Sequence, residues 1–331
     1  MGNVLPYICP INGDDLVLEK NFYRSSLNKK YKIKKNIPRF CSEDNYTESF
    51  GYQWNKFHNT QIDSFSNTDL SHQRFWAETK WDPKKLKDLN ILEIGSGAGR
   101  FTEVFLKSTK GNLYSIDYSA AVEANLRNNK KFKSRLILSQ ASIYQIPFKN
   151  NSFDKIFCFG VLQHTPSFRK SISALVSKIK INGEIVIDFY PYKGFYTKLH
   201  SKYILRPITK RIPKKFLLFL IKKSVPFSLF IFDILIKIKL GFLSRFLPIT
   251  DVRGFPENLN YKQRIEWAIM DTFDAFSPEF DNPQRLKKVI KMFEEEGCKV
   301  TFGGLVSYKG GSAVVVRAIK KPKLRREEPN D

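Results

Sequence analysis

The sequence contains little cysteine, little histidine and comparatively few acidic residues. There are four cysteines and four histidines in 331 residues. No two cysteines are spaced as in a redox pair or a complete zinc motif, which favours a reduced, cytoplasmic chain over a disulfide-bonded secreted one. The cysteines are Cys9, Cys41, Cys158 and Cys298. The first residues also lack a basic region followed by an apolar core, so no secretory signal is predicted.

Acidic residues are outnumbered by basic residues, 32 to 56, which gives a formal charge of +24. An excess of this size favours an anionic partner such as nucleic acid, anionic lipid or a phosphorylated substrate. An AT-rich genome would also raise the lysine count, so charge alone does not choose among these partners. With 42% hydrophobic and 14% aromatic residues, the composition is that of a folded chain.

From residue 90 onward, short apolar runs alternate with stretches of helical length, which is typical of a parallel sheet with crossover helices. Strands are predicted at 90–94, 112–116, 135–138, 155–159, 184–189, 300–306 and 312–318. Helices are predicted at 100–107, 120–128, 168–180 and 283–297, with Asn182 and Gly183 ending the third. The predicted fold class is α/β, with a doubly wound seven-stranded sheet.

Three further parts flank or interrupt this α/β domain, which is expected to cover residues 86–190 and 251–319. Residues 1–85 are polar and aromatic without clear periodicity and are predicted to form an N-terminal extension. Residues 191–250 are predicted to form a basic helical insertion, and residues 320–331 a flexible tail.

The basic insertion has two open interpretations. Residues 193–250 contain 13 Lys or Arg and one acidic residue, and their longest uncharged run is nine residues. A helix that spans a bilayer needs about 20 apolar residues, so no transmembrane helix is predicted. The insertion could form a lid over a substrate, or it could lie on an anionic membrane surface, and one role does not exclude the other.

The most informative segment is a buried strand that runs into a glycine turn and then a helix, residues 91–100. Such a turn lets the backbone approach a ligand closely at a helix N-terminus. A dinucleotide site would have Gly-x-Gly-x-x-Gly, whereas the glycines here alternate with other residues. The motif comprises Glu93, Gly95, Ser96, Gly97 and Gly99. This spacing resembles motif I of class I S-adenosylmethionine-dependent methyltransferases.

The resemblance implies a Rossmann-like sheet that binds S-adenosylmethionine as the methyl donor and uses no metal. An acidic residue at the strand end, here Glu93, suits the cationic amino-acid end of that cofactor. Asp117 and Tyr118 follow the next strand, and Asp117 would accept hydrogen bonds from the ribose or would instead cap the helix beginning near Ser119. Further cofactor contacts are implied for the adenine loop and the end of the fourth strand, at Ala141, Ser142, Phe159 and Gly160.

His164 lies in the loop that follows the predicted fourth strand. Open α/β sheets bind ligands at the carboxyl ends of their strands, so His164 is a candidate general base for a substrate hydroxyl. The alternative is a histidine that shapes the loop or contacts the cofactor.

The flanks carry weaker resemblances. Residues 7–13 resemble the zinc-ribbon-like leader found ahead of some bacterial methyltransferase domains, but Asn12 occupies the position of the second cysteine, so no zinc is predicted. Residues 49–57 resemble a segment of related methyltransferases, in which Tyr52, Gln53 or Trp54 would close over the cofactor or anchor the extension. The carboxylates of residues 270–281 could orient a polar acceptor or cap a helix.

The predicted function is methyl transfer from S-adenosylmethionine to a small-molecule, glycan or lipid-linked acceptor. RNA methylation is the alternative, although no RNA-binding module is recognisable. A non-catalytic regulatory protein that retains the fold is a third possibility. The expected location is the cytoplasm, with peripheral attachment to the inner membrane surface as an open option, and the oligomeric state is left open.

Overall fold

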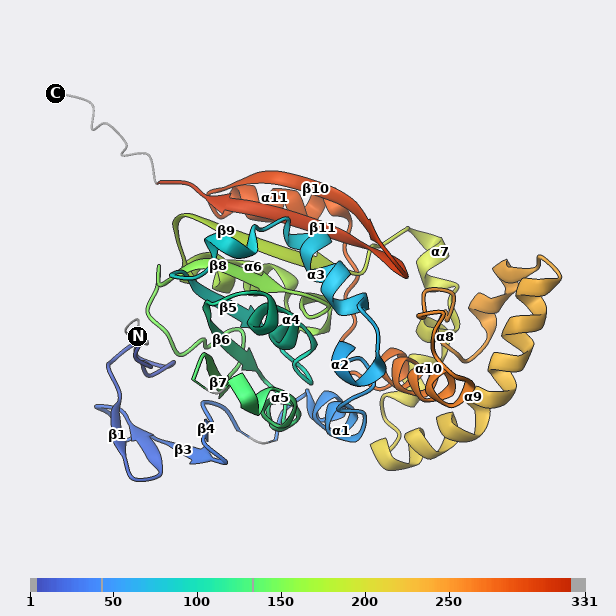
Figure 1. The fold of residues 1–331 in the computed structure, drawn as a ribbon, viewed down its shortest axis with the longest axis horizontal. Helices are drawn as coiled ribbons and strands as arrows, with labels where there is room; N and C mark the ends of the chain where they lie inside the picture. Colours follow the sequence, from blue (N-terminus) through green and yellow to red (C-terminus); the bar gives the residue numbers. More distant parts are fainter. Residues whose placement is uncertain (1–4, 43, 133, 323–331) are drawn as a thin grey trace.

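A seven-stranded sheet forms the centre of the computed structural model, which describes residues 5–42, 44–132 and 134–322 (Figure 1). The strand order is β10-β11-β9-β8-β5-β6-β7. Neighbouring strands from β7 to β9 are parallel, whereas β11 is antiparallel to both of its neighbours. The strands are β5 (Asn90–Ile94), β6 (Asn112–Asp117), β7 (Leu136–Gln140), β8 (Phe153–Cys158), β9 (Ile179–Phe189), β10 (Cys298–Tyr308) and β11 (Gly311–Lys320).

The order of this sheet confirms the predicted α/β fold class. From β5 the chain winds outward to β6 and β7 and then crosses to β8 on the other side of β5. The carboxyl ends of β5 and β8 therefore mark a topological switch point, where open α/β sheets bind ligands.

Helices cover both faces of the sheet because strands buried on both sides need apolar partners above and below. On one face, Leu92 and Ile94 share a core cluster with Val289 and Phe293 of α11. On the other, Ile91 shares a cluster with side chains of α3 and α4. The helices of this domain are α4 (Arg100–Ser108), α5 (Val122–Asn129), α6 (Phe168–Lys178) and α11 (Leu286–Glu295), with short 3-10 turns η1 (Pro83–Lys85), η2 (Lys130–Phe132) and η3 (Leu162–His164).

The predicted helix stop at Asn182 and Gly183 is wrong. Helix α6 ends at Lys178, and Ile179 begins β9 directly. Between the pairs Phe153–Ile179 and Lys155–Glu184 the register shifts, so that four residues of β9 face one of β8. Asn182 has φ +64° within this irregularity. Asn182 and Gly183 therefore form a bulge within β9. Residues that adopt positive φ are favoured in bulges as well as at helix ends.

The N-terminal extension contains a small antiparallel sheet followed by three helices. The strands pair in the order β1-β2-β3-β4, with Asn12 outside them donating to Asp14 at 2.6 Å from its Nδ2. The elements are β1 (Val17–Glu19), β2 (Phe22–Arg24), β3 (Lys30–Lys34), β4 (Ile37–Pro38), α1 (Glu48–Lys56), α2 (Asp63–Ser66) and α3 (Leu70–Thr79). Phe75 of α3 is fully buried in the domain core, so this part of the extension packs into the domain.

Residues 191–276 form a helical layer beside the sheet (Figure 1). Its elements are α7 (Phe195–Lys198), α8 (Ser201–Thr209), α9 (Lys214–Lys237), η4 (Gly241–Phe246) and α10 (Tyr261–Phe276). Because α9 and α10 share one core cluster, the layer continues past residue 250, where the sequence placed the end of the insertion. None of the helices in the described part of the chain has the length and apolar character that crossing a membrane requires.

The expected tail begins later than residue 320. Lys320 is the last residue of β11, and its Nζ donates to the carbonyl of Val176 at 2.7 Å. Residues 323–331, the rest of the expected tail, lie outside the described residues.

Candidate active site

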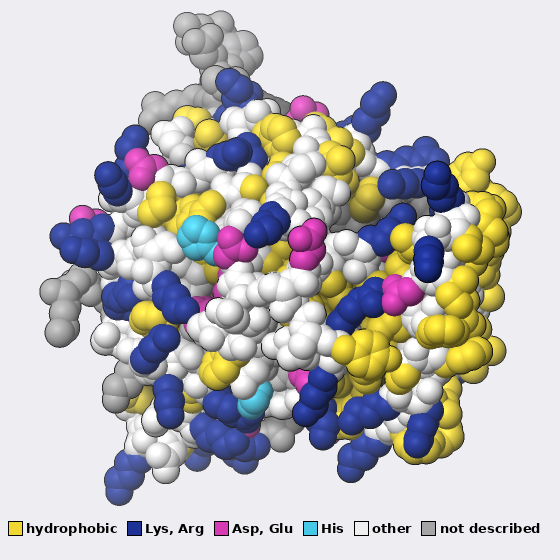
Figure 2. All heavy atoms as spheres, turned by 45° about the vertical axis from the view of Figure 1, so that its right-hand side comes forward, with side chains coloured by type: hydrophobic (Ala, Val, Ile, Leu, Met, Phe, Trp, Pro, Cys, Tyr) yellow, Lys and Arg dark blue, Asp and Glu magenta, His cyan; other side chains and the backbone are white. Residues whose placement is uncertain are grey.

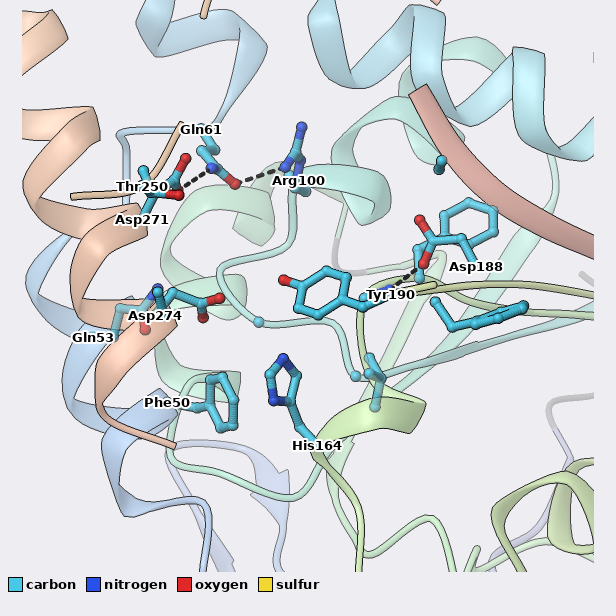
Figure 3. Close-up of a pocket in the computed structure, with 18 of the residues that line it drawn as sticks. Phe50, Gln53, Gln61, Arg100, His164, Asp188, Tyr190, Thr250, Asp271 and Asp274 are labelled. Carbon is cyan, nitrogen blue, oxygen red and sulfur yellow. Dashed lines mark hydrogen bonds between the residues drawn. The ribbon is translucent and has the colours of Figure 1, made fainter. Parts of the chain in front are cut away.

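A cavity of about 950 Å³ lies at the carboxyl ends of the parallel strands. Four parts of the chain line it: the loops after the parallel strands, the N-terminal extension, the helical layer of residues 191–276, and the hairpin of β10 and β11. Figure 3 places Phe50 and Gln53 of α1 opposite the strand ends, with Asp271 and Asp274 of α10 on the same side as α1. Segments more than 200 residues apart thus meet at one site.

The glycine turn closes tightly beneath this cavity. Gly95, Gly97 and Gly99 all have positive φ, at +76°, +53° and +85°. A Cβ on Gly95 would lie 2.2 Å from a methyl group of Val161, and one on Gly97 would lie 3.2 Å from the indole nitrogen of Trp54. The turn therefore requires glycine for both its backbone conformation and its space.

The amides of this turn are occupied within the protein. The N–H groups of Gly95 and Ser96 donate to the carbonyl of Ile116 at 2.8 and 3.2 Å. The N–H of Gly97 donates to Asp117 Oδ2 at 2.8 Å. Because these three donors are satisfied, the turn does not offer a cradle for a pyrophosphate.

Asp117 caps the turn before α5, and its contact with a ribose remains a prediction. Its Oδ1 accepts from the N–H and the hydroxyl of Ser119 at 2.8 and 2.7 Å, which fixes the following turn. The same residue lines the cavity, and burial raises its pKa. A carboxylate offers about four acceptor positions, so Oδ2, which within the described residues accepts only from Gly97, keeps capacity for a ligand hydroxyl.

Glu93 lies behind the glycine turn and does not line the cavity. Its Oε2 accepts from the hydroxyls of Thr102 and Ser115 at 2.5 and 2.7 Å. Burial raises the pKa of Glu93 to about 7. Its visible role is to tie β5 to β6 and α4, and direct contact with a cofactor remains a prediction.

The other predicted cofactor residues divide into two groups. Gly99 and Ser142 are also outside the cavity lining, and Ser142 Oγ instead accepts from the N–H of Tyr144 at 3.2 Å. The lining includes the remaining members of the predicted set, which are Gly95, Ser96, Gly97, Asp117, Tyr118, Ala141, Phe159 and Gly160. The hydroxyl of Ser96 is buried without a hydrogen-bond partner, so it remains available to a ligand.

His164 lines the cavity (Figure 3), and its contacts assign the ring proton to one nitrogen. Its Nδ1 lies 2.9 Å from the carbonyl oxygen of Phe280, which can only accept a hydrogen bond, so Nδ1 carries the proton. Burial lowers the pKa of His164, which favours the neutral ring. Nε2 is therefore an acceptor. The ring is held between Phe50 and Tyr190, whose centroids lie 5.0 and 5.7 Å away.

The side of the cavity formed by α10 is acidic and carries a free amide. Asp271 accepts from Gln61 Nε2 at 3.0 Å, and burial together with the Asp274 carboxylate raises the pKa of Asp271 to about 8. Gln53 is buried, lines the cavity, and has no partner for either its amide nitrogen or its amide oxygen. Gln53 was one of three candidates for a ligand contact in the sequence, and its unpartnered amide favours it.

Two arginines at the site carried no sequence signal. Arg74 of α3 pairs with Glu78 at 2.8 Å and with Asp188 at the end of β9. Arg100, the first residue of α4, donates to the neutral groups Ser71 Oγ and Gln61 Oε1 at 3.1 and 2.6 Å. Burial, with Arg74 nearby, lowers the pKa of Arg100 to about 10. A buried cation that bonds only neutral partners is suited to a ligand carboxylate.

Comparison with known protein families identifies the α/β part of the chain. Residues 92–187 match the family model described as a methyltransferase domain. This segment is a methyltransferase domain. The methyl donor of such domains is S-adenosylmethionine.

Individual relatives match only part of the chain. A tRNA U34 carboxymethyltransferase of Helicobacter pylori (strain G27) is 30% identical over 120 residues, 34% of this chain and 46% of the relative. One from Nautilia profundicola is 27% identical over 136 residues, 39% of this chain and 45% of the relative. The chain thus spans less than half of each relative. Magnesium protoporphyrin IX methyltransferase (ChlM) from Synechocystis PCC 6803 aligns with 83% of this chain and 97% of its own, at 14% identity and a TM-score of 0.45.

The residues of the methyltransferase domain fit S-adenosylmethionine. The glycine turn allows close approach and holds no phosphate site, which agrees with a cofactor that lacks pyrophosphate. Asp117 offers an acceptor to a ribose hydroxyl, and the unpartnered hydroxyl of Ser96 lies in the same turn. Ile143 and Phe159 supply apolar lining for an adenine ring. Arg100 would supply a cation for the carboxylate of the methionine end.

Proposed function

We propose that the protein transfers a methyl group from S-adenosylmethionine to a hydroxyl of a small-molecule, glycan or lipid-linked acceptor. The observation that carries this proposal is the tautomer of His164. The bond between Nδ1 and the carbonyl of Phe280 leaves Nε2 as a proton acceptor, and His164 lines the same cavity as the glycine turn. When bound, S-adenosylmethionine supplies an electrophilic methyl group. The methyl group would pass to the acceptor oxygen with release of S-adenosylhomocysteine, and His164 Nε2 would take the hydroxyl proton.

The chain's own residues divide the remaining work. Asp117 and Ser96 orient the cofactor, and Arg100 binds its carboxylate. Phe50 and Tyr190 hold the His164 ring and exclude water from it. A base with a pKa near or below neutral suits this task because it is deprotonated at the working pH.

The acidic side of the cavity favours an acceptor with several hydroxyls. With a pKa of about 8, Asp271 is protonated at neutral pH and can donate a hydrogen bond. Gln53 can both donate and accept. Sugar and polyol hydroxyls also both donate and accept, so they match these groups.

RNA is the alternative acceptor, because the relatives named above are tRNA U34 carboxymethyltransferases and the chain is strongly basic. The sequence carries no recognisable RNA-binding module, which disfavours RNA. The proposal therefore ranks RNA second, and a non-catalytic regulatory role third.

The first test is calorimetric titration with S-adenosylmethionine and S-adenosylhomocysteine, followed by transfer of a labelled methyl group to lipid, glycan and tRNA extracts. Label is expected in the lipid or glycan fraction. His164→Gln should retain cofactor binding and lose about 100-fold or more of the transfer rate. His72→Gln, an exposed histidine on α3, is the matched control.

Three results would contradict the proposal in different ways. Failure of the wild-type protein to bind either cofactor would favour the non-catalytic role. Label found in tRNA alone would replace the acceptor class. Undiminished transfer by His164→Gln would remove the assigned base and leave the cofactor site intact.

A further inference from the structure

Helix α9 carries apolar side chains on two opposite sides. Its inner side packs against α10 in one core cluster, which contains Leu217, Ile221, Val225 and Phe232 of α9. At 3.6 residues per turn, a second set at three- and four-residue spacings falls on the other side of the helix. This set is Phe216, Phe219, Leu220, Phe227, Phe230 and Ile234, and all six are exposed.

An apolar stripe of this kind requires a partner. A helix that is hydrophobic all round is normally buried, yet the side chains of Phe227 and Phe230 are 68% and 62% exposed. The stripe is part of a wider concentration. Of the twenty-four large hydrophobic side chains exposed in the described part of the chain, sixteen lie within residues 195–246. Figure 2 shows them gathered along the right-hand side of the molecule, where α9 lies in Figure 1.

The same segment is strongly basic. Residues 193–250 hold 13 Lys or Arg against Asp233 alone, a net charge of +12. Asp233 is itself paired with Arg264 of α10 through two bonds of 2.6 and 2.7 Å. Lys222 and Lys223 are exposed on α9 between the phenylalanines of the stripe. Lys202, Arg206 and Lys210 pair with carboxylates outside the segment, whereas Lys222 and Lys223 form no ion pair within the described residues. The outer surface of α9 therefore combines apolar side chains with unpaired lysines.

We propose that the outer face of α9 docks on an anionic lipid bilayer, with the helix lying in the interface. Apolar side chains would enter the boundary between headgroups and acyl chains while lysines contact lipid phosphates. A second copy of the chain fits less well, because pairing through this face would bring two segments of charge +12 together. Nucleic acid fits less well too, because its interfaces are polar rather than rich in exposed phenylalanine.

Docking would place the cavity close to the bilayer. Ile249 and Val252 pack in the same core cluster as the inner side of α9, and residues 249–251 line the cavity. An acceptor anchored in the membrane could thus reach the site without leaving the lipid surface. The docking itself does not depend on the proposed methyl transfer and is tested without it.

The test is flotation of the full chain with vesicles of phosphatidylcholine alone or of equal parts phosphatidylcholine and phosphatidylglycerol, at low and high salt. We expect binding to the anionic vesicles that weakens with salt. The double variants Phe227→Ser/Phe230→Ser and Lys222→Glu/Lys223→Glu should each weaken binding about tenfold or more. The control Val17→Ser/Leu18→Ser changes exposed apolar residues of β1 and should bind like wild type.

Other results would overturn the docking proposal or assign the face to another partner. No flotation with anionic vesicles at low salt overturns the proposal, as does binding that the phenylalanine variant leaves unchanged. Light scattering that shows a dimer dissociated by Phe227→Ser/Phe230→Ser, without vesicle binding, assigns the face to a second copy. Binding of S-adenosylhomocysteine, measured on every variant, separates these outcomes from loss of the fold or of the cofactor site.

Discussion

Among single residues, Gly99 and Gly297 allow two costs of replacing a glycine to be measured apart: the strain of a positive φ and the clash of an added Cβ with neighbouring atoms. Both have positive φ, +85° and +80°. A Cβ on Gly297 would meet nothing within 4 Å, whereas one on Gly99 would lie 2.3 Å from Asn125 Oδ1 and 2.4 Å from Asn129 Nδ2. Gly297→Ala should therefore cost about 1 kcal/mol of unfolding free energy, and Gly99→Ala about 3 kcal/mol, measured by urea denaturation. Equal losses would show that the asparagines move aside freely.

A second prediction concerns Arg100. If its guanidinium binds the carboxylate of the cofactor, Arg100→Gln should weaken S-adenosylhomocysteine binding about 10- to 100-fold, because a hydrogen bond between charged groups contributes about 1.5–3 kcal/mol. Calorimetry checks the value. Arg135→Gln is the control, since Arg135 bonds backbone carbonyls away from the cavity, including that of Leu106 at 2.6 Å. Equal affinity of Arg100→Gln and wild type, with both folded, would remove Arg100 from the cofactor site.

The site could be predicted from the sequence only where a short motif spans it. Gly95, Gly97 and Asp117 stand out because strand, turn and helix follow each other directly along the chain. The direction in which Glu93 points depends on Thr102 and Ser115, which reach it from other elements, so its place behind the turn was not visible. The sequence offered Gln53 as only one of three candidates and gave no signal for Arg100, because the role of both depends on burial beside segments distant in sequence.

Among the elements, α8 is joined to the segment that positions His164. Buried Arg206 of α8 bonds Asp281 at 2.8 Å and the carbonyl of Pro278 at 2.8 Å. Asp281 directly follows Phe280, whose carbonyl fixes the His164 tautomer. The helical layer therefore contacts the segment of the proposed base through Asp281, which pairs with Lys202 of α8 and, in a buried ion pair, with Arg206.

Breaking this pair is the third prediction. Arg206→Met removes the guanidinium from buried Asp281 but leaves its ion pair with Lys202, so it should lower the free energy of unfolding by about 1.5–3 kcal/mol, the contribution of a hydrogen bond between charged groups. Lys210→Met is the matched control on the same helix, because Lys210 pairs with Glu279 at a position where Glu279 is 46% exposed, and it should cost less than about 1 kcal/mol. Urea denaturation of both variants checks the difference. Similar losses would mean that burial does not distinguish the two pairs.

Among the elements, the parallel strands could be predicted because strands that are buried on both faces are rich in neighbouring apolar residues, as in β5 and β8. The small sheet β1–β4 was not, because its strands are two to five residues long and three of them are largely exposed or half-exposed. The limit of the helical layer was also missed. Helix α10 contributes buried residues to the cluster of α9, a tertiary contact that composition does not mark.

Across the whole molecule, buried acids should make stability fall as pH rises through neutrality. Burial raises the pKa of Glu93 from 4.5 to about 7 and that of Asp271 from 3.8 to about 8, the latter with help from Asp274. Between about pH 5 and 8 the folded state keeps protons that the unfolded chain has released. Stability from these groups is therefore present at about pH 5, declines as pH rises, and levels off above about pH 8.

The fourth prediction is that the urea midpoint falls across this range and that Glu93→Gln flattens the part of the curve between about pH 5 and 7, because an uncharged amide no longer loses a proton there. Glu257→Gln, at an exposed glutamate, should leave the curve unchanged. A wild-type midpoint that rises from pH 5 to 8 would mean that buried histidines with lowered pKa, such as His164 and His200, govern the pH dependence instead, because the unfolded chain binds protons at these rings that the folded chain does not. The slope thus tells whether buried acids or buried histidines dominate the pH dependence of stability.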